Sequence, residues 1–257
     1  MNSKYTIFVN SCDSFEDCWN PFFKLLKIYW PQHTGKIILN TDKKEFNISE
    51  TNIVCSKTQG RSIARLTWSE SFSRALDLVE TKYLVYFQED YFLCSPVDHY
   101  RFLASLNEMA TNPEIKSISL TAFGSLGPYK KWRTPGFCEI NRFAKYRLST
   151  QVSLWDVESL KSYIRNPENA WQFELLGTVR SWLKNETFLA CWDERSTATA
   201  SVFKYPHTGV IKGSWNSEVV GLFSSHGITV DFSRRGFHSP QSKFLSRYQL
   251  LKKIFNK

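Results

Sequence analysis

The acidic pair Glu89-Asp90 has the clearest potential for chemistry in this chain, because it directly follows the apolar run Tyr83–Phe87. Such a run is typical of a buried strand. In open α/β sheets, ligands bind beyond the carboxyl ends of the strands. A carboxylate there commonly holds a divalent metal, which in turn holds a phosphate. The pair therefore predicts a site for a phosphorylated ligand such as a nucleotide; the alternative is a solvated loop.

Alternating strands and helices in the first half of the chain would position these carboxylates. The pattern of apolar residues predicts strands at Tyr5–Asn10, Lys36–Asn40, Asn52–Cys55, Tyr83–Phe87 and Ile115–Leu120. It predicts helices at Phe15–Tyr29, Arg65–Glu80, Val97–Met109, Leu154–Arg165 and Trp171–Leu183. This alternation favours an α/β fold with a mostly parallel central sheet and helices on both faces. Three of the strands end in polar or acidic residues, which would gather at one edge of the sheet.

Composition and charge limit the classes of protein to consider. Of the 257 residues, 42% are hydrophobic and 22% are charged, which is typical of a globular chain. The formal net charge of +9 favours anionic partners: nucleic acid, phosphorylated small molecules or an anionic membrane surface. The six cysteines are scattered without a C-x-x-C pair, which argues against zinc and for reduced thiols in a cytosolic compartment.

Several motifs are missing from the sequence. It contains neither G-x-G-x-x-G nor G-x-x-x-x-G-K-[ST], which argues against a dinucleotide oxidoreductase and a P-loop NTPase. The absence of G-x-S-x-G argues against a serine hydrolase of the α/β type. We see no signal peptide and no apolar stretch near the roughly 20 residues of a membrane span. We therefore expect a cytoplasmic protein.

The segment 242–257 is basic and amphipathic. It has five basic residues and no acidic ones, and its apolar residues at helical spacing are Phe244, Leu245, Tyr248, Leu251 and Phe255. A helix of this kind can lie on anionic lipid. The alternative is a terminal helix that docks its apolar face on the domain and leaves its lysines in water.

The chemistry-bearing segments follow one another in a recognisable order. They are Trp68 on a helix, the Tyr83–Phe87 strand with Gln88-Glu89-Asp90 at its end, Gln151 before Trp155, Trp171-Gln172-Phe173-Glu174, and a late glycine-containing region over 205–215. In this order they resemble the GT-A glycosyltransferases of bacteria, especially those that build lipopolysaccharide or capsule sugars. The resemblance covers most of the chain, from about Tyr5 to Phe237, and rests on the combination rather than on any one motif.

The resemblance implies a single Rossmann-like GT-A domain over residues 1–241 with an irregular C-terminal part. About 1–120 would form the nucleotide-sugar-binding half, and about 121–241 the acceptor-binding and catalytic half. Such an enzyme moves a sugar from a nucleotide-sugar donor to a hydroxyl of a glycan or lipid-linked glycan acceptor. The amphipathic segment would hold it at the inner face of the cytoplasmic membrane, and no nucleic-acid partner is expected.

The resemblance also assigns residues to the donor. The implied nucleotide-sugar contacts are Asn10, Ser11, Asp13, Asn40, Arg65, Glu89, Asp90, Lys212, Arg234 and Arg235. Asn40, and Asp42 near it at the end of the second strand, are the weaker options. Asp90 is the expected ligand of a divalent metal, Mn²⁺ or Mg²⁺. Because Gln88 stands where the first Asp of Asp-x-Asp is expected, metal dependence stays open.

An inverting transfer needs a base to deprotonate the attacking hydroxyl. Glu174 is the first candidate, because partial burial beside Trp171 and Phe173 would raise its pKa toward the working range. Asp156 is the second candidate. Gln151, Trp171 and His207 are expected to contact the acceptor. The alternative is that Glu174 is an ordinary surface residue of a helix whose aromatic side chains belong to the core.

Two other functions compete with glycosyl transfer. A sugar nucleotidyltransferase shares the phosphate and metal chemistry, but it usually has a glycine-rich loop and a basic residue after the first strand. The segment Ser11-Cys12-Asp13-Ser14 offers neither. A non-enzymatic nucleic-acid-binding module would fit the net charge, although basic and aromatic residues interleave only in Tyr129-Lys130-Lys131-Trp132-Arg133 and the terminal segment.

Overall fold

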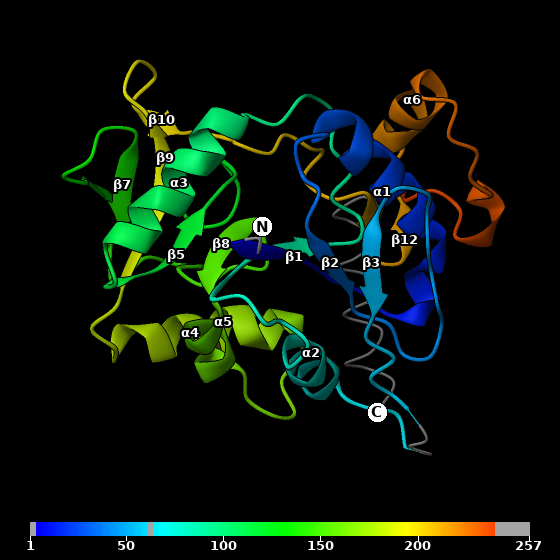
Figure 1. The fold of residues 1–257 in the computed structure, drawn as a ribbon, viewed down its shortest axis with the longest axis horizontal. Helices are drawn as coiled ribbons and strands as arrows, with labels where there is room; N and C mark the ends of the chain where they lie inside the picture. Colours follow the sequence, from blue (N-terminus) through cyan, green and yellow to red (C-terminus); the bar gives the residue numbers. More distant parts are fainter. Residues whose placement is uncertain (1–3, 61–63, 240–257) are drawn as a thin grey trace, which may run out of the picture. The chain divides into compact units, whose positions relative to one another are not determined.

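The computed structural model describes residues 4–60 and 64–239 of the chain (Figure 1). Its backbone divides into two compact units, Met1–His207 and Thr208–Lys257, which are described separately below. The basic segment 242–257 lies outside the described residues. Within the described ranges, no helix combines the length and the apolar character needed to cross a membrane.

The first unit is built on one large sheet. Its described strands are β1 (Tyr5–Asn10), β2 (Lys36–Leu39), β3 (Asn52–Cys55), β4 (Tyr83–Gln88), β5 (Ile115–Ser119), β6 (Tyr129–Lys131), β7 (Phe137–Ile140), β8 (Ser153–Asp156), β9 (Thr187–Asp193) and β10 (Ala198–Thr199). They lie in the order β3-β2-β1-β4-β8-β5-β9-β7-β6, with β10 also on β9. The first four strands of this order are mutually parallel, and β8 runs antiparallel between β4 and β5.

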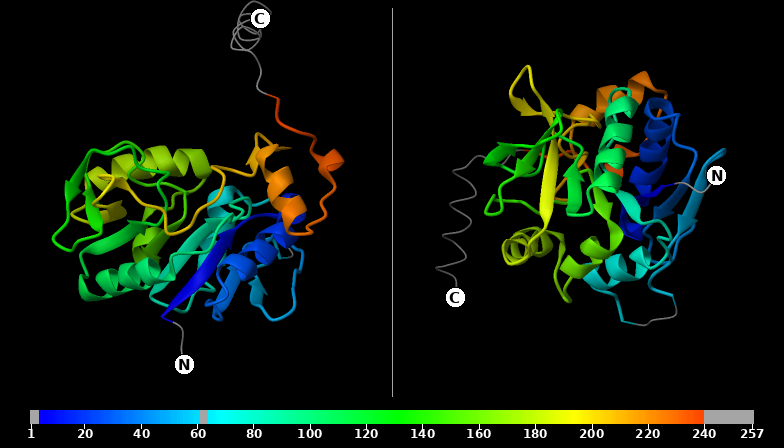
Figure 2. Two further views of the ribbon diagram at one scale, coloured as in Figure 1. Left: turned by 90° about the horizontal axis from the view of Figure 1, so that it is seen from above. Right: turned by 60° about the vertical axis from the view of Figure 1, so that its left-hand side comes forward.

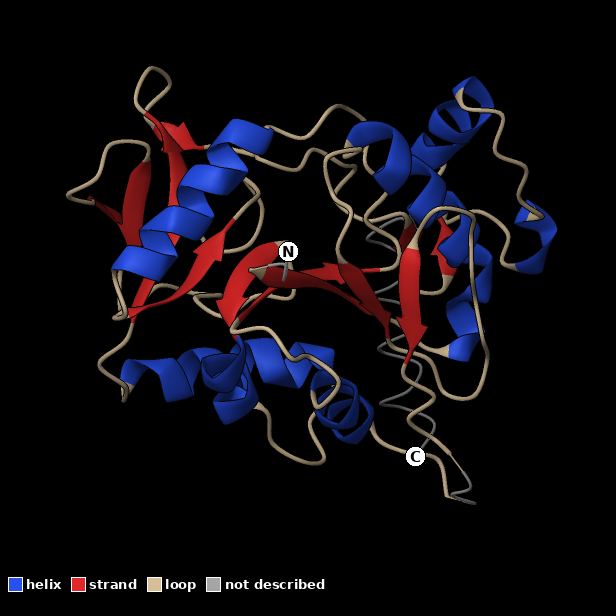
Figure 3. Cartoon of the chain, viewed as in Figure 1, coloured by secondary structure: helices blue, strands red, loops and turns tan. Residues whose placement is uncertain are grey.

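Helices cover both faces of this sheet (Figures 1 and 3). They are α1 (Glu16–Tyr29), α2 (Trp68–Leu76), α3 (His99–Thr111), α4 (Val157–Tyr163) and α5 (Ala170–Trp182), with a short 3-10 turn η1 (Asp13–Phe15) ahead of α1. Successive side chains of a strand point to opposite faces. Phe8 and Tyr86 accordingly pack with Phe72 of α2, whereas Phe87 packs on the other face against Phe22 of α1.

The expected mostly parallel α/β sheet is confirmed, with two local corrections. The predicted helix over Leu154–Arg165 begins instead as strand β8, and only Val157–Tyr163 is helical. Apolar residues of a short buried strand and of a buried helix give similar sequence patterns, which explains the error. The helix predicted from Arg65 begins at Trp68, because Thr67 caps it.

The second unit has little regular structure. Its described elements are β11 (Val210–Ile211), β12 (Ser214–Trp215), α6 (Glu218–Ser225) and the 3-10 turn η2 (Phe232–Arg234). Trp215 is fully buried, and its ring lies 5.9 Å from that of Phe223 and 5.6 Å from that of Phe232. This aromatic cluster is the core of the unit. Figure 2 shows α6 and the segment after it in orange and red.

Candidate functional site

A cavity of about 230 Å³ lies where β1 and β2 end and α2 begins. Its lining residues are Ser11, Cys12, Asn40, Asp42, Arg65, Leu66, Thr67, Trp68 and Ser71. Three of the predicted donor contacts, Ser11, Asn40 and Arg65, are therefore in one pocket. We call it the carboxyl-edge pocket, since it lies beyond the carboxyl ends of parallel strands.

Two aspartates connect the loops after β1 and β2, which both contribute residues to this pocket. The Asp13 carboxylate accepts hydrogen bonds from the backbone N–H groups of Asp42 (2.9 Å), Lys43 (3.0 Å) and Lys44 (3.2 Å). In return, the Asp42 carboxylate accepts one from the backbone N–H of Asp13 (3.2 Å). The predicted donor residue Asp13 is thus engaged with the loop after β2, where it positions the pocket wall.

A network of amide and hydroxyl groups fixes Asn40 in the pocket. Its Nδ2 donates to Asn10 Oδ1 at 2.9 Å, and its Oδ1 accepts from Ser56 (2.8 Å) and Ser71 (3.3 Å). Asn10 is buried and donates to the Tyr86 hydroxyl at 3.2 Å. Asn10 therefore supports the pocket from behind. A network whose members are paired in this way holds its side chains in one arrangement.

The N-terminus of α2 forms the opposite wall. Thr67 and Glu70 make a capping box, in which each side chain bonds the backbone N–H of the other residue. The cap turns the chain so that Arg65 stays in the exposed loop ahead of the helix. Trp68, the first residue of α2, is half-buried against Phe72 and Phe173, with ring centroids 5.0 and 5.5 Å away. Helix N-termini favour anionic ligands, and an arginine beside one strengthens that preference.

Glu89 and Asp90, at the end of β4, are both nearly buried, with 7% and 6% of their surfaces exposed. Neither lines the carboxyl-edge pocket. Burial raises the pKa of the Tyr86 hydroxyl; hydrogen bonds to Asn10 and Gln88 oppose the shift, and the charges of Glu89 and Glu174 add to it. These carboxylates therefore lie within electrostatic reach of the same tyrosine.

Cys12 connects the pocket with the β4 carboxylates. Its pKa is raised mainly by burial; a hydrogen bond to Ser14 lowers it, and the negative charges of Glu89 and Asp42 raise it further. A side chain that lines the pocket thus responds to the charge of Glu89. Strand pairing agrees with this: Asn10 lies opposite Gln88, so the end of β4 is beside the residues after β1 that line the pocket.

Glu174 of α5 faces the loop that leads into β8. Its Oε1 accepts from the backbone N–H (2.6 Å) and the hydroxyl (2.8 Å) of Thr150, and from the Ser149 hydroxyl at 3.4 Å. The next residue, Gln151, donates to the Tyr91 hydroxyl at 3.0 Å and accepts from Tyr205 at 2.9 Å. Both residues lie near the end of β4, and both also position this loop.

The structure does not bring every predicted residue to this edge. Asp156 is paired with Tyr83 across β8 and β4, so it lies at the opposite edge of the sheet, where it caps α4 through Ser159. This position removes it as a candidate base for the carboxyl-edge pocket. Trp171 is 63% exposed at the start of α5. His207 is exposed, with its ring against Phe123.

The three cationic candidates of the second half belong to the second unit. Lys212 is exposed in the turn between β11 and β12, with φ of 50°. Arg234 is exposed, and Arg235 is half-buried, with its guanidinium 6.0 Å from the Trp215 ring. Their roles at the donor stay a prediction.

Sequence reasoning missed Cys12, Thr67 and Ser71 as lining residues. The spacing Thr67-x-x-Glu70 is the signature of a capping box and gave a usable signal for the helix start. Cys12 and Ser71 carry no such signal, because only the tertiary fold brings them together. The described residues contain no group of three or more His, Cys, Asp or Glu side chains arranged to hold a metal ion.

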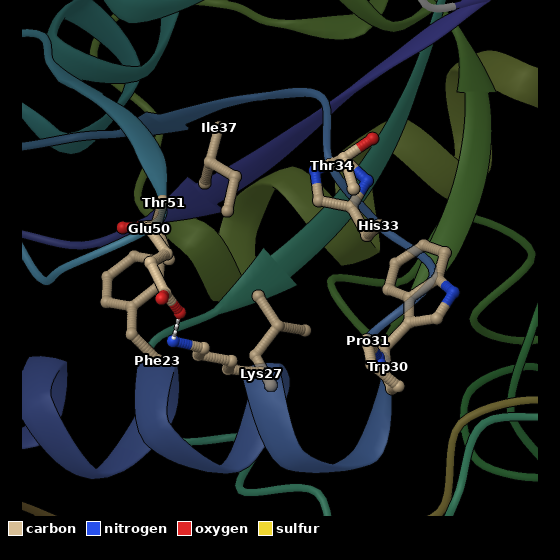
Figure 4. Close-up of a pocket in the computed structure, with 10 residues that line it drawn as sticks. Phe23, Lys27, Trp30, Pro31, His33, Thr34, Ile37, Glu50 and Thr51 are labelled. Atoms are coloured by element: carbon tan, nitrogen blue, oxygen red, sulfur yellow. Dashed lines mark hydrogen bonds and ion pairs between the residues drawn. The ribbon is translucent and has the colours of Figure 1, made fainter.

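A second cavity, of about 260 Å³, lies between α1 and the chain around β2 (Figure 4). Phe23, Leu26, Trp30 and Ile37 give it apolar walls, and its charged side chains, Lys27 and Glu50, form an ion pair with each other. With its charges paired, this cavity offers an apolar space rather than a reactive centre.

No protein-family model matches the chain, and no curated protein matches it in sequence. Solved structures match it in fold. TarS 1–349 of S. aureus in complex with UDP has a TM-score of 0.51 at 12% identity, over 91% of this chain and 68% of that one. TarS of S. aureus has a TM-score of 0.50 at 12% identity, over 76% of this chain and 36% of that one. The chain has a GT-A-like fold.

Two further facts define the extent of the similarity. In another structure of TarS 1–349 from S. aureus, the matched part is only 59% of that chain. A glucosyl-3-phosphoglycerate synthase from Mycobacterium tuberculosis, in complex with Mn²⁺, UDP and phosphoglyceric acid, matches with a TM-score of 0.45 at 13% identity, over 88% of this chain and 79% of that one. At 12% identity, the similarity to the TarS structures concerns the fold and not the substrates.

Proposed function

We propose that the protein is a glycosyltransferase whose carboxyl-edge pocket binds the nucleoside diphosphate of a nucleotide-sugar donor. The observation that carries the proposal is the convergence of Ser11, Asn40, Asp42 and Arg65 on one pocket beside the half-buried Trp68. Asn40, held by its partners, forms part of the wall against which a nucleoside would lie, and the Asp42 carboxylate would accept a hydrogen bond from it. Trp68 offers an aromatic face, and Arg65 a charge for the phosphates.

The donor would extend from this pocket toward the end of β4, where its diphosphate meets Glu89 and Asp90. Two carboxylates repel a diphosphate unless a cation lies between them. Carboxylate oxygens are suitable ligands for Mg²⁺ or Mn²⁺. Asp90, with Glu89, would hold such an ion, and the phosphates would supply further ligands. When bound, the ion neutralises charge that develops on the leaving diphosphate.

Glu174 is the proposed base for the acceptor hydroxyl. Its Oε1 accepts from Thr150, and the other carboxylate oxygen would take the proton of an incoming hydroxyl. Gln151 and Trp171 would contact the acceptor. We place the acceptor among the glycans of bacterial surface polysaccharides, lipopolysaccharide or capsule, assembled at the cytoplasmic face of the membrane.

A thermal-shift screen with UDP, GDP, CDP, CMP and dTDP, each with and without Mn²⁺ or Mg²⁺, tests the proposal. A ligand that binds only the native state raises the melting temperature. We expect one nucleotide to stabilise the protein, and Arg65→Ala to weaken that effect. Lys130→Ala, which removes an exposed charge on β6, is the matched control and should leave the shift unchanged. A flat response across the panel contradicts the proposal.

A product assay separates glycosyl transfer from the competing nucleotidyl transfer. The nucleotide selected by the screen would be supplied as its sugar conjugate, and release of the nucleoside diphosphate would be measured. Release of pyrophosphate from a nucleoside triphosphate and a sugar phosphate would instead identify a sugar nucleotidyltransferase.

A further inference from the structure

A larger cavity, of about 760 Å³, lies at the amino ends of the parallel strands, on the edge of the sheet away from the donor pocket. Since Tyr5 pairs with Tyr83 and Lys36 with Asn52, the starts of β1, β4, β2 and β3 meet there. The lining includes Lys4, Lys36 and Lys82. We call it the amino-edge cavity.

The charge of this cavity is strongly asymmetric. The lining contains three lysines and a single carboxylate, that of Glu80, whose side chain is 81% exposed. The Lys36 Nζ lies 3.5 Å from Oε2 of Glu80 and donates a hydrogen bond to the backbone carbonyl of Leu78 at 3.3 Å. Lys82 lies over the ring of Tyr83, 5.2 Å from its centroid. Convergent cations in a concave surface raise the local concentration of anions.

Neutral donors lie beside the lysines. Thr34 and Asn52 are exposed in the lining and can bond the oxygens of an anion. Thr6 and Thr81 are paired with each other at 2.9 Å, so they contribute to the wall. Three ammonium groups with amide and hydroxyl donors suit a phosphate, whose oxygens only accept hydrogen bonds when it is ionised.

An apolar cleft of about 340 Å³ adjoins the cavity. The two share Lys4, Tyr83 and Ala110, and the cleft is continued by Leu103 and Leu106 of α3. Leu103 is 46% exposed, so part of this apolar surface faces solvent. A ligand bound across both would place charge among the lysines and hydrocarbon along α3.

We propose that the amino-edge cavity binds the phosphate of a lipid, with the start of its hydrocarbon chain in the adjoining cleft. Charge complementarity selects the headgroup, and the cleft selects an amphiphile over a free anion. The site is separate from the donor pocket, because parallel strands place their two ends at opposite edges of the sheet. A lipid bound there would hold the protein at a phospholipid surface and leave the carboxyl-edge pocket free for the donor.

Titration of the full chain with soluble short-chain lipids tests this proposal. Dihexanoyl phosphatidic acid is the probe, and dihexanoyl phosphatidylcholine and inorganic pyrophosphate are the comparison ligands. We expect saturable binding of the phosphatidic acid, weakened about ten-fold or more in Lys4→Gln/Lys82→Gln. Lys130→Gln on β6 makes the same kind of charge change outside the cavity and should bind like the unmodified protein.

A second pair of variants separates the lipid from a free phosphate. Leu103→Gln should weaken the binding of phosphatidic acid but leave the binding of pyrophosphate unchanged. Leu126→Gln, at an exposed leucine outside the cleft, should change the binding of neither ligand. Equal affinity for pyrophosphate and phosphatidic acid, insensitive to Leu103→Gln, would overturn the lipid assignment. Binding that survives in Lys4→Gln/Lys82→Gln, or no saturable binding, would overturn the site itself.

Discussion

The two edges of the same sheet differ in charge and in order. At the carboxyl edge, Asp13 and Asp42 bond each other's loops, and Glu89 and Asp90 are nearly buried. At the amino edge, Lys4 and Asn52 are exposed, and three lysines line the cavity. The first edge is preorganised and carries four carboxylates, so the proposed diphosphate would need a cation there. The second carries three lysines, which would attract a phosphate without a metal, and its exposed groups are held less firmly.

Metal removal should give the largest difference between the edges. We expect chelation of divalent ions to weaken nucleotide binding at the carboxyl edge about ten-fold or more, because uncompensated carboxylates repel the diphosphate. Phosphatidic acid binding at the amino edge should not change. Calorimetric titration with each ligand, with and without EDTA, measures both. If EDTA weakened the binding of both ligands equally, the proposed difference in charge between the two edges would be wrong.

Asp13→Ala should be the most destabilising of the carboxyl-edge variants. The change removes the acceptor of three backbone N–H groups in the loop after β2, and we expect a loss of about 2–3 kcal/mol in the free energy of unfolding. Asp17→Ala, an acidic residue in the first turn of α1, serves as the control and should cost less. Urea denaturation gives both values. Equal costs would show that the loop does not depend on Asp13.

Glu174 variants separate positioning from proton transfer. Glu174→Gln keeps an oxygen that can accept from Thr150, so stability should stay within about 1 kcal/mol of the original. If Glu174 is the base, kcat should fall about 100-fold or more. Glu174→Ala should lower both stability and activity. Full activity of Glu174→Gln would leave Glu174 a purely positioning residue.

Cys12 offers a smaller, local probe of the carboxyl edge. Burial and the nearby charges raise its pKa, so at a given pH less thiolate is present than for an ordinary thiol. Its alkylation should therefore be slow at pH 8 and still accelerate above pH 9. Mass spectrometry of iodoacetamide-treated protein, with Cys12→Ser as the blank, follows the rate. Bound nucleotide should slow it further, and a fast reaction at pH 7 would contradict this environment.

The sequence predicted the framework better than the site. Strands such as Tyr5–Asn10 and Asn52–Cys55 were located correctly because apolar runs bounded by polar residues are a local signal. The ends of β1 and β2 could also be expected to meet, since parallel strands align their ends. Asp156 was misjudged because β8 runs antiparallel, which sends its last residue to the other edge.

The lining of the pocket depended on contacts that no local pattern records. Ser71 is in the first turn of α2 and lines the pocket beside Asn40, with which it forms a hydrogen bond. The amino-edge cavity was not predicted either: Lys4, Lys36 and Lys82 are isolated lysines in the sequence and converge only through strand pairing. Tertiary structure, rather than composition, concentrates charge at each edge.

Hydrogen–deuterium exchange with the nucleotide selected by the thermal screen tests the central claim most directly. The claim is that a nucleoside diphosphate binds at the carboxyl edge. We predict that the ligand protects backbone amides in 10–13, 40–44 and 64–71, the segments that form the pocket, and leaves 34–37 and 80–83 at the amino edge unchanged. Protection confined to the amino-edge segments, or absent from 64–71 despite saturation, would contradict the account.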